Sequence, residues 1–468
     1  MEKAEEASGY KKGKVWATAV HAVLGIFIFT YNIGVFTPSQ PCVAASLKWG
    51  ENSKTYIGVV SSFLPLGALI GALFAGYMSK HIGHRKNLII GDLIIIAASL
   101  ITILPSTVCF GLGRFLSGVG IGIFSALCPI YLSEISPASI SGRIGSLISV
   151  FGCLGTLFAF SFALFLPTEY FDTDPKNDYW IFMFLFQGIV AAIQLSLFLV
   201  SFKNESPLWL LSKGQTEEAL TSLKSLYSNE YALEILETIQ STPMLTKNDS
   251  YRSISHEFTY KDLITFTPET AKAMRLGLLL SIIQQFSGIN AILSYATSLF
   301  SQFGSGVFAA RIFTVFTGVF KFVSCFCLIP LIDYAGRKNL LIGGCIGMAI
   351  CLTTVGLMSL YKVYYVLPII FVELYLGFFV NSIGPICWLY SGEILCSKAM
   401  SICTAVNWFS AFLVVLCFPF MIEFIGLGNT FWIFAAVNII GAVYFMVDMV
   451  ETKGMMKSEI RALFIASE

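Results

Sequence analysis

Three observations predict an all-α membrane protein, a bundle of twelve transmembrane helices in two six-helix halves. They are the composition, the spacing of the apolar runs and a set of motifs that occurs twice. Hydrophobic residues make up 56% of the 468 and charged residues only 12%, where a soluble domain carries roughly 25% charged residues. The charges cluster between long apolar stretches, as expected for helices that cross a lipid bilayer. The net charge of +1 gives no reason to expect a nucleic-acid partner.

The apolar runs are each long enough to cross a bilayer as a helix, which takes about 20 residues. They predict spans at 15–36, 55–79, 87–105, 109–133, 143–166 and 179–202, and then at 272–300, 307–332, 339–360, 363–391, 399–422 and 427–449. The first run is too long for a cleavable signal peptide, so we interpret it as a retained span. The predicted organisation is a tail at 1–14, a half at 15–202, an insert at 203–270, a half at 271–450 and a tail at 451–468.

The polar insert is too short for a catalytic domain with its own core. Its patterning predicts small helices, among them Thr216–Leu226 and Tyr231–Ile239. Basic residues concentrate in the loops on the same side as the insert, and such loops face the cytoplasm. We therefore expect both termini and the insert to be cytoplasmic, in a multi-pass protein of the plasma membrane.

A set of three motifs occurs in each half, in the same order. Gly83-His84-Arg85-Lys86 is followed by a glutamate at 134 and another at 205, and the counterparts are Gly336-Arg337-Lys338, Glu393 and Glu451. Each counterpart lies about 250 residues further on, which indicates a duplicated six-helix unit. Paired halves with a binding site between them are a transporter design.

These motifs place glycine, basic residues and glutamate at helix ends on one face. Glycine allows a tight turn, and arginine can pair with a carboxylate of another helix. Such pairs would form a cytoplasmic latch that breaks when this face opens, although ordinary positive-inside charge is the alternative. Repetition in both halves favours the latch. Its predicted members are Arg85, Arg114, Glu134, Arg143, Glu205, Arg337, Glu393 and Glu451.

A further series of motifs runs through the chain. It comprises Tyr31-Asn32-Ile33-Gly34-Val35, Gly113-Arg114-Phe115, Pro129-Ile130-Tyr131-Leu132-Ser133-Glu134, Glu205-Ser206-Pro207, Gln284-Gln285-Phe286-Ser287-Gly288-Ile289-Asn290, Gly384-Pro385, Trp388, Asn407-Trp408 and Glu451-Thr452-Lys453-Gly454. With these motifs the chain resembles the sugar porter family of the major facilitator superfamily, from about Trp16 to Gly454. The resemblance implies a substrate path at the centre of the bundle, open alternately to each side.

By this resemblance the substrate-binding residues are Gln284, Gln285, Asn290 and Asn407, with Trp388 as an apolar face for the sugar ring. The chemistry suits the role, because amides both donate and accept hydrogen bonds and so match hydroxyl groups without charge. An aromatic face packs against the C–H side of a pyranose. The alternative for the two glutamines is hydrogen bonding between helices.

Asn32 occupies a position that the resemblance links to energy coupling. Family members that couple sugar to protons tend to carry aspartate there, whereas facilitative members tend to carry asparagine. Asn32 cannot titrate, so the resemblance implies passive, facilitated movement. Asp92 and Glu373 lie elsewhere in the bundle and could bind a proton, which keeps a proton-coupled carrier as an alternative.

Two substrate-path positions depart from the family pattern. The fifth-span glutamine that commonly contacts sugar aligns with Ser149, and the eighth-span asparagine aligns with Lys321. A lysine near mid-membrane is costly unless it is paired or hydrated. One interpretation is structural, with Lys321 paired to Glu373 or snorkelling along its helix. The other is a cation facing the cavity, which would favour an anionic or phosphorylated solute.

The predicted function is transport of a hexose or related sugar by alternating access. Three alternative functions remain open. They are a sugar sensor, a transport-inactive subunit of a membrane assembly, and a proton-coupled or anionic-sugar carrier. We expect no enzymatic activity and no cofactor. We also expect no metal site, because the twelve cysteines show no zinc-type spacing. The expected partners are a small-molecule sugar and the lipid bilayer, and the sequence gives no indication of oligomeric state.

Overall fold

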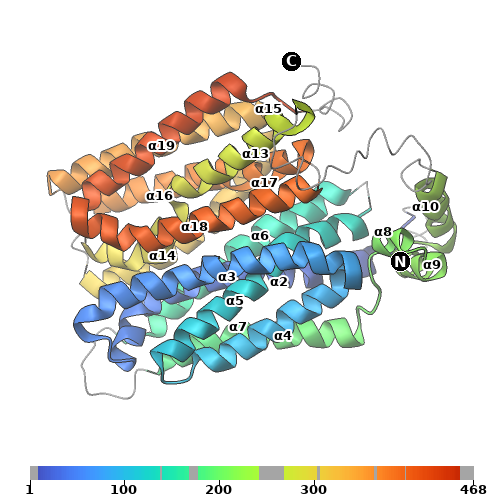
Figure 1. Ribbon diagram of the computed structural model, residues 1–468, viewed down its shortest axis with the longest axis horizontal. Helices are drawn as coiled ribbons and strands as arrows, with labels where there is room; N and C mark the ends of the chain where they lie inside the picture. Colours follow the sequence, from blue (N-terminus) through green and yellow to red (C-terminus); the bar gives the residue numbers. More distant parts are fainter. Residues whose placement is uncertain are drawn as a thin grey trace.

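The computed structural model describes residues 9–137, 140–167, 178–241, 268–302, 306–362, 366–395 and 397–453. These residues form a bundle of long helices with three short helices gathered at one end (Figure 1). Within the described ranges the only extended pairing is an isolated bridge between Tyr10 and Tyr227. The all-α fold class is therefore confirmed.

The N-terminal half contains six long helices. They are α2 (Lys12–Ser46), α3 (Ser53–Ile82), α4 (His84–Thr102), α5 (Thr107–Ile135), α6 (Ser141–Ser161) and α7 (Tyr179–Val200), with the short 3₁₀ helices η1 (Gly50–Asn52) and η3 (Phe162–Phe165) between them. Glycines bring α3 and α5 into backbone contact. A Cβ at Gly67 would collide with the Phe115 carbonyl, and one at Gly118 with the Leu64 carbonyl. Small residues at such crossings are how helices pack closely in a membrane.

The C-terminal half is built from helices that break within their spans. Its helices are α13 (Pro268–Phe286), α14 (Ile289–Phe300), α15 (Gly306–Leu360), α16 (Val366–Val380), α17 (Ile383–Ile394), α18 (Ser397–Ile425) and α19 (Leu427–Asp448). α13 and α14 form one span interrupted at Gly288, whose φ is +100°. α15 is two spans joined at Gly336, whose φ is +79°. α16 and α17 together form one further span.

Eleven helical segments of the described chain are long and apolar enough to cross a membrane. α4 is the remaining long helix, and it carries Arg85, Lys86 and Asp92 within its 19 residues. With α4 the bundle has six spans in each half, as the hydropathy predicts. The buried apolar side chains form one large cluster for each half.

The short helices α8 (Pro207–Ser212), α9 (Thr216–Leu226) and α10 (Asn229–Ser241) lie at what we call the insert end of the bundle (Figure 1). The two helices predicted in the insert are present, as α9 and within α10. The start of α2 is attached to them, because the Lys11 backbone N–H donates to the Leu226 carbonyl at 2.8 Å. Residues 242–267 of the predicted insert and most of both predicted tails lie outside the described residues.

The two halves contact each other mainly through three pairs of helices. α3 packs along α18, α6 along the first segment of α15, and α2 against α14. Thr37 and Gln40, near the far end of α2, donate to the backbone carbonyls of Leu293 and Ser294 in α14, each at 2.8 Å. Each of the three ion pairs found among the described residues stays within one half.

Candidate functional site

Four amide side chains form a closed hydrogen-bond network inside the C-terminal half. Gln285 Nε2 donates to Asn407 Oδ1 at 2.8 Å, and Asn407 Nδ2 donates to Gln284 Oε1 at 2.6 Å. Asn290 Nδ2 donates to Gln285 Oε1 at 2.6 Å. The two glutamines are 3% and 6% exposed and Asn407 is 1% exposed. The structure thus brings together the four amides singled out by the sequence, from α13, α14 and α18.

The breaks in two spans position this network. Gln284 Nε2 donates to the Gly384 carbonyl at 2.8 Å and to the Ile383 carbonyl at 3.3 Å, at the start of α17. The interruption between α13 and α14 frees the Ser287 carbonyl, which accepts from the Tyr375 hydroxyl at 3.1 Å. Broken helices at mid-membrane supply the polar groups of a transporter's binding site.

Trp408 is a further candidate for the substrate site. It was not among the predicted substrate-binding residues, although it belongs to the Asn407-Trp408 motif. It follows Asn407 on α18, is 4% exposed, and its indole N–H has no hydrogen-bond partner in the described structure. Its ring meets Phe29 of α2 edge-on, with centroids 5.6 Å apart. The contact joins the two halves beside the amide network. Trp388, the predicted aromatic face, lies on α17 and is 36% exposed.

Arg114 is buried inside the N-terminal half, away from the charge cluster at the insert end. Its Nη1 donates to the backbone carbonyl of Asn32 at 3.0 Å, and its guanidinium lies 5.4 Å from the ring centre of Phe36. The prediction that it belongs to the cytoplasmic latch is therefore wrong. Where no carboxylate is near, a guanidinium donates hydrogen bonds to carbonyl oxygens and packs against aromatic rings. Asn32 itself is fully buried and bonds the Ile28 carbonyl.

Lys321 lies on the first segment of α15, where that segment faces α6. Its Nζ donates to Thr156 Oγ1 of α6 at 3.1 Å, so it links the two halves. The suggested partner Glu373 instead accepts a hydrogen bond from Thr317, one turn away on α15. The hypothesis of a Lys321–Glu373 pair therefore does not hold in this structure. Ser149 lies on α6 and is partly exposed.

The polar cluster at the insert end of the N-terminal half is organised by Glu205. Its carboxylate accepts hydrogen bonds from the backbone N–H groups of His84 at 3.0 Å and Arg85 at 2.8 Å, at the start of α4. Glu134 lies 3.3 Å from His84 Nε2 and accepts from the Ser206 hydroxyl. The Arg85 guanidinium donates to backbone carbonyls at the end of α7, so its predicted pairing with a carboxylate is wrong.

The C-terminal half repeats this cluster. Glu451 accepts from the backbone N–H groups of Arg337 and Lys338, each at 3.0 Å. Glu393 pairs with Arg337 Nη2 at 3.0 Å and accepts from the Thr452 hydroxyl at 2.5 Å. A carboxylate at the start of a helix is stabilised by the free N–H groups and the helix dipole. Arg143, also predicted in the latch, is exposed on α6 and belongs to none of the ion pairs described.

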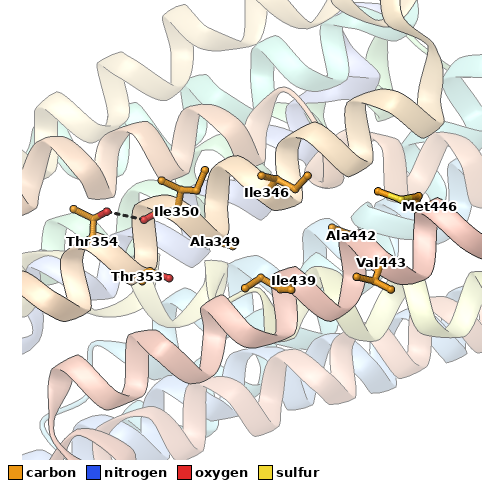
Figure 2. A pocket seen from close by; sticks show the side chains of 9 residues that line it. All are labelled: Ile346, Ala349, Ile350, Thr353, Thr354, Ile439, Ala442, Val443 and Met446. Carbon is orange, nitrogen blue, oxygen red and sulfur yellow. Dashed lines mark hydrogen bonds between the residues drawn. The ribbon is translucent and has the colours of Figure 1, made fainter.

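A groove of about 460 Å³ lies between the second segment of α15 and α19 (Figure 2). Its lining is apolar except for Thr353 and Thr354, and the Thr354 hydroxyl donates to the Ile350 carbonyl of its own helix at 2.8 Å. Ile350 and Met446 are 59% and 56% exposed. The groove is therefore on the outer, lipid-facing side of the bundle, and it offers no polar group to a sugar.

A repeated six-helix unit, with a buried polar network where broken helices meet, defines a membrane transporter. Comparison with known proteins agrees. The family described as "Sugar (and other) transporter" matches residues 17–464, and the chain belongs to this family. Its members are membrane transporters and not enzymes, and this chain is accordingly a sugar transporter.

Two curated relatives and one solved structure illustrate the similarity. The chain is 30% identical to the major myo-inositol transporter IolT of Bacillus subtilis, over 95% of this chain and 93% of that protein. It is 31% identical to the facilitated trehalose transporter Tret1 of Bombyx mori, over 97% and 89%. Its fold matches the partially occluded inward-open xylose transporter XylE from E. coli with a TM-score of 0.80 and 24% identity, covering 95% of this chain and all of that one.

Proposed function

We propose that this protein is a hexose facilitator that works by alternating access. The observation that carries the proposal is the network of Gln284, Gln285, Asn290 and Asn407, whose groups are neutral and both donate and accept hydrogen bonds. Sugar hydroxyls can exchange with such bonds without the cost of moving a charge. The unpartnered indole N–H of Trp408 adds a donor for one further hydroxyl.

The proposal includes passive movement. Asn32 is buried beside the Arg114 guanidinium and cannot release or bind a proton between the two states. One relative, from Bombyx mori, is described as a facilitated transporter, whereas another, from E. coli, is described as a D-xylose-proton symporter. The residue at this position favours the first type of mechanism for the present chain.

We further propose that the insert end faces the cytoplasm, with the protein in the plasma membrane. Arg85, Lys86, Arg337 and Lys338 begin their helices at the insert end, and short loops rich in Lys and Arg face the cytoplasm. The cross-half hydrogen bonds of Thr37 and Gln40 then lie on the outer side.

Uptake of radiolabelled D-glucose into proteoliposomes tests the function. We expect saturable uptake that xylose or myo-inositol inhibits, that a protonophore leaves unchanged, and that Gln284→Ala reduces about 10- to 100-fold. A rate that collapses with the protonophore would contradict passive transport. The absence of saturable uptake for all three compounds would favour the sensor or the transport-inactive subunit.

Lys321 supports a second candidate, a carrier for acidic sugars. Its ammonium group contacts a hydroxyl of Thr156, and none of the three ion pairs among the described residues includes it. A carboxylate or phosphate on the sugar would offset the cost of a cation inside the bundle. The test is competition of glucose uptake by glucuronate in the wild type and in Lys321→Asn. Unchanged selectivity in the variant would rule this candidate out.

A further inference from the structure

Two cysteines from different halves meet where α6 packs on the first segment of α15. Cys153 belongs to α6 and Cys325 to α15, and they are 5% and 4% exposed. The Cys325 thiol donates to the Phe322 carbonyl of its own helix at 3.0 Å. With Val380 the two cysteines form a small buried cluster that is separate from the large core of either half. A thiol pair therefore lies directly on the surface along which the halves must move.

The surroundings of this pair favour thiol chemistry. Lys321 lies one helical turn before Cys325 and interacts electrostatically with both thiols. A neighbouring ammonium group stabilises a thiolate, which is the nucleophilic form of cysteine. Lys321 is held there by Thr156, one turn after Cys153 on α6. Lys321 itself is partly exposed.

We propose that Cys153 and Cys325 are an oxidative modification site, at which a disulfide joins the two halves and arrests transport. With hydrogen peroxide as the oxidant, the Cys153 thiolate attacks one oxygen, the O–O bond breaks and hydroxide leaves, which gives a sulfenic acid. The Cys325 thiol then attacks the sulfenic sulfur, the S–O bond breaks, and the oxygen leaves as water with the thiol proton. In balance, two thiols and one peroxide give one disulfide and two waters, since the released hydroxide takes up a proton.

The arrest follows from the position of the bond. Alternating access requires the halves to change their packing against each other. A disulfide fixes its two Cα atoms within a narrow range of distances, so α6 and α15 could no longer separate or slide at this point. Cys387 and Cys403 offer a matched contrast. They are also electrostatic neighbours, but both belong to the C-terminal half, on α17 and α18.

The test uses the full chain in proteoliposomes, treated with hydrogen peroxide and then with dithiothreitol. Mass spectrometry of non-reduced peptides should detect a Cys153–Cys325 linkage, and the melting temperature should rise because the bond constrains the unfolded chain. Sugar uptake should fall to background and recover on reduction. Cys153→Ser and Cys325→Ser should each keep their uptake under peroxide, whereas the Cys387→Ser/Cys403→Ser double variant should lose it as the wild type does.

Two results would overturn the proposal. One is the absence of the linked peptide in peroxide-treated protein that remains folded. The other is a linked protein that transports at the untreated rate. The linkage and the melting shift are measured without any sugar, so a failure of the hexose proposal is distinguishable from a failure of this one.

Discussion

At the insert end the two halves are built alike. In the N-terminal half Glu205 binds the start of α4 and Glu134 lies against His84, and in the C-terminal half Glu451 binds the second segment of α15. There the second glutamate pairs with an arginine instead of a histidine. The duplicated unit has therefore kept its carboxylates and turns, while the side chain that faces the second carboxylate differs.

Inside the bundle the halves differ more. The C-terminal half bonds its buried amides to one another, in the network around Gln285 and Asn407. The N-terminal half uses buried polar groups such as Gln194 and Arg114 to bind backbone carbonyls. This contrast indicates that duplication preserved the turns that hold helices together, whereas groups suited to a substrate accumulated in one half. Each prediction below compares a change in one half with a change in the other.

The largest effect is expected at the two turn glycines. Gly83 and Gly336 have φ of +95° and +79° with ψ near 170°, a region that only glycine occupies readily. A Cβ at either position would also press on the carboxylate of Glu205 or Glu451. Gly83→Ala and Gly336→Ala should each lose about 2 kcal/mol or more of stability from backbone strain alone. The measurement is the yield of monodisperse protein and its melting temperature.

Gly145 provides the control for that pair, because it lies inside α6 and a Cβ there meets nothing within 4 Å. Gly145→Ala should fold like the wild type or slightly better, since alanine favours a helix. If only one of the two substitutions, Gly83→Ala or Gly336→Ala, lowers the stability, the two turns are not equivalent.

The next effect concerns transport and compares a buried amide of the C-terminal half with one of the N-terminal half. Gln284→Ala removes bonds to Gly384, Ile383 and Asn407, each worth about 1 kcal/mol. Sugar uptake should fall about 10- to 100-fold. Gln194→Leu removes a 3.2 Å bond to the His21 carbonyl in the N-terminal half and should leave sugar selectivity unchanged. Equal loss of uptake in both variants, at equal yield, would break the proposed contrast between the halves.

The amide network and the turns differ in how far the sequence revealed them. The turns at Gly83 and Gly336 were predictable because a glycine followed by basic residues indicates a tight turn at a helix end. The repetition of the motif showed that the two turns are equivalent. The four amides were found because the resemblance named them. Their mutual bonding was not predictable, because it depends on where α13 breaks relative to α18. Arg114 was misplaced for the same reason: its motif gives a position along α5 but not the partner that it meets across the bundle.

Lys321 shows the limit of local charge arguments. Sequence alone offered Glu373 as its partner, but Glu373 bonds Thr317, whereas Lys321 reaches Thr156 in the other half. The contact between Cys153 and Cys325 was unpredictable for a similar reason, since it depends on how α6 packs on α15. Packing between halves leaves no periodic signal in either helix.

The smallest effect tests the difference between His84 and Arg337. Arginine keeps its charge at all physiological pH values, whereas histidine is charged only when protonated. In Arg337→His, pairing with Glu393 would raise the pKa of the introduced imidazole above its unfolded value of about 6.5. The pairing would then stabilise the fold fully below that pH and be lost as the pH rises through the folded-state pKa.

The melting temperature of Arg337→His should therefore fall between about pH 6 and pH 8, relative to a wild-type C-terminal cluster that keeps its ion pair throughout. The expected loss is about 1 kcal/mol, because the pair is only partly buried. The reciprocal His84→Arg should place a guanidinium opposite Glu134 and make the N-terminal cluster resemble its counterpart. If Arg337→His leaves the pH profile unchanged, the Thr452 hydroxyl, which this variant retains, holds the Glu393 carboxylate in place by itself.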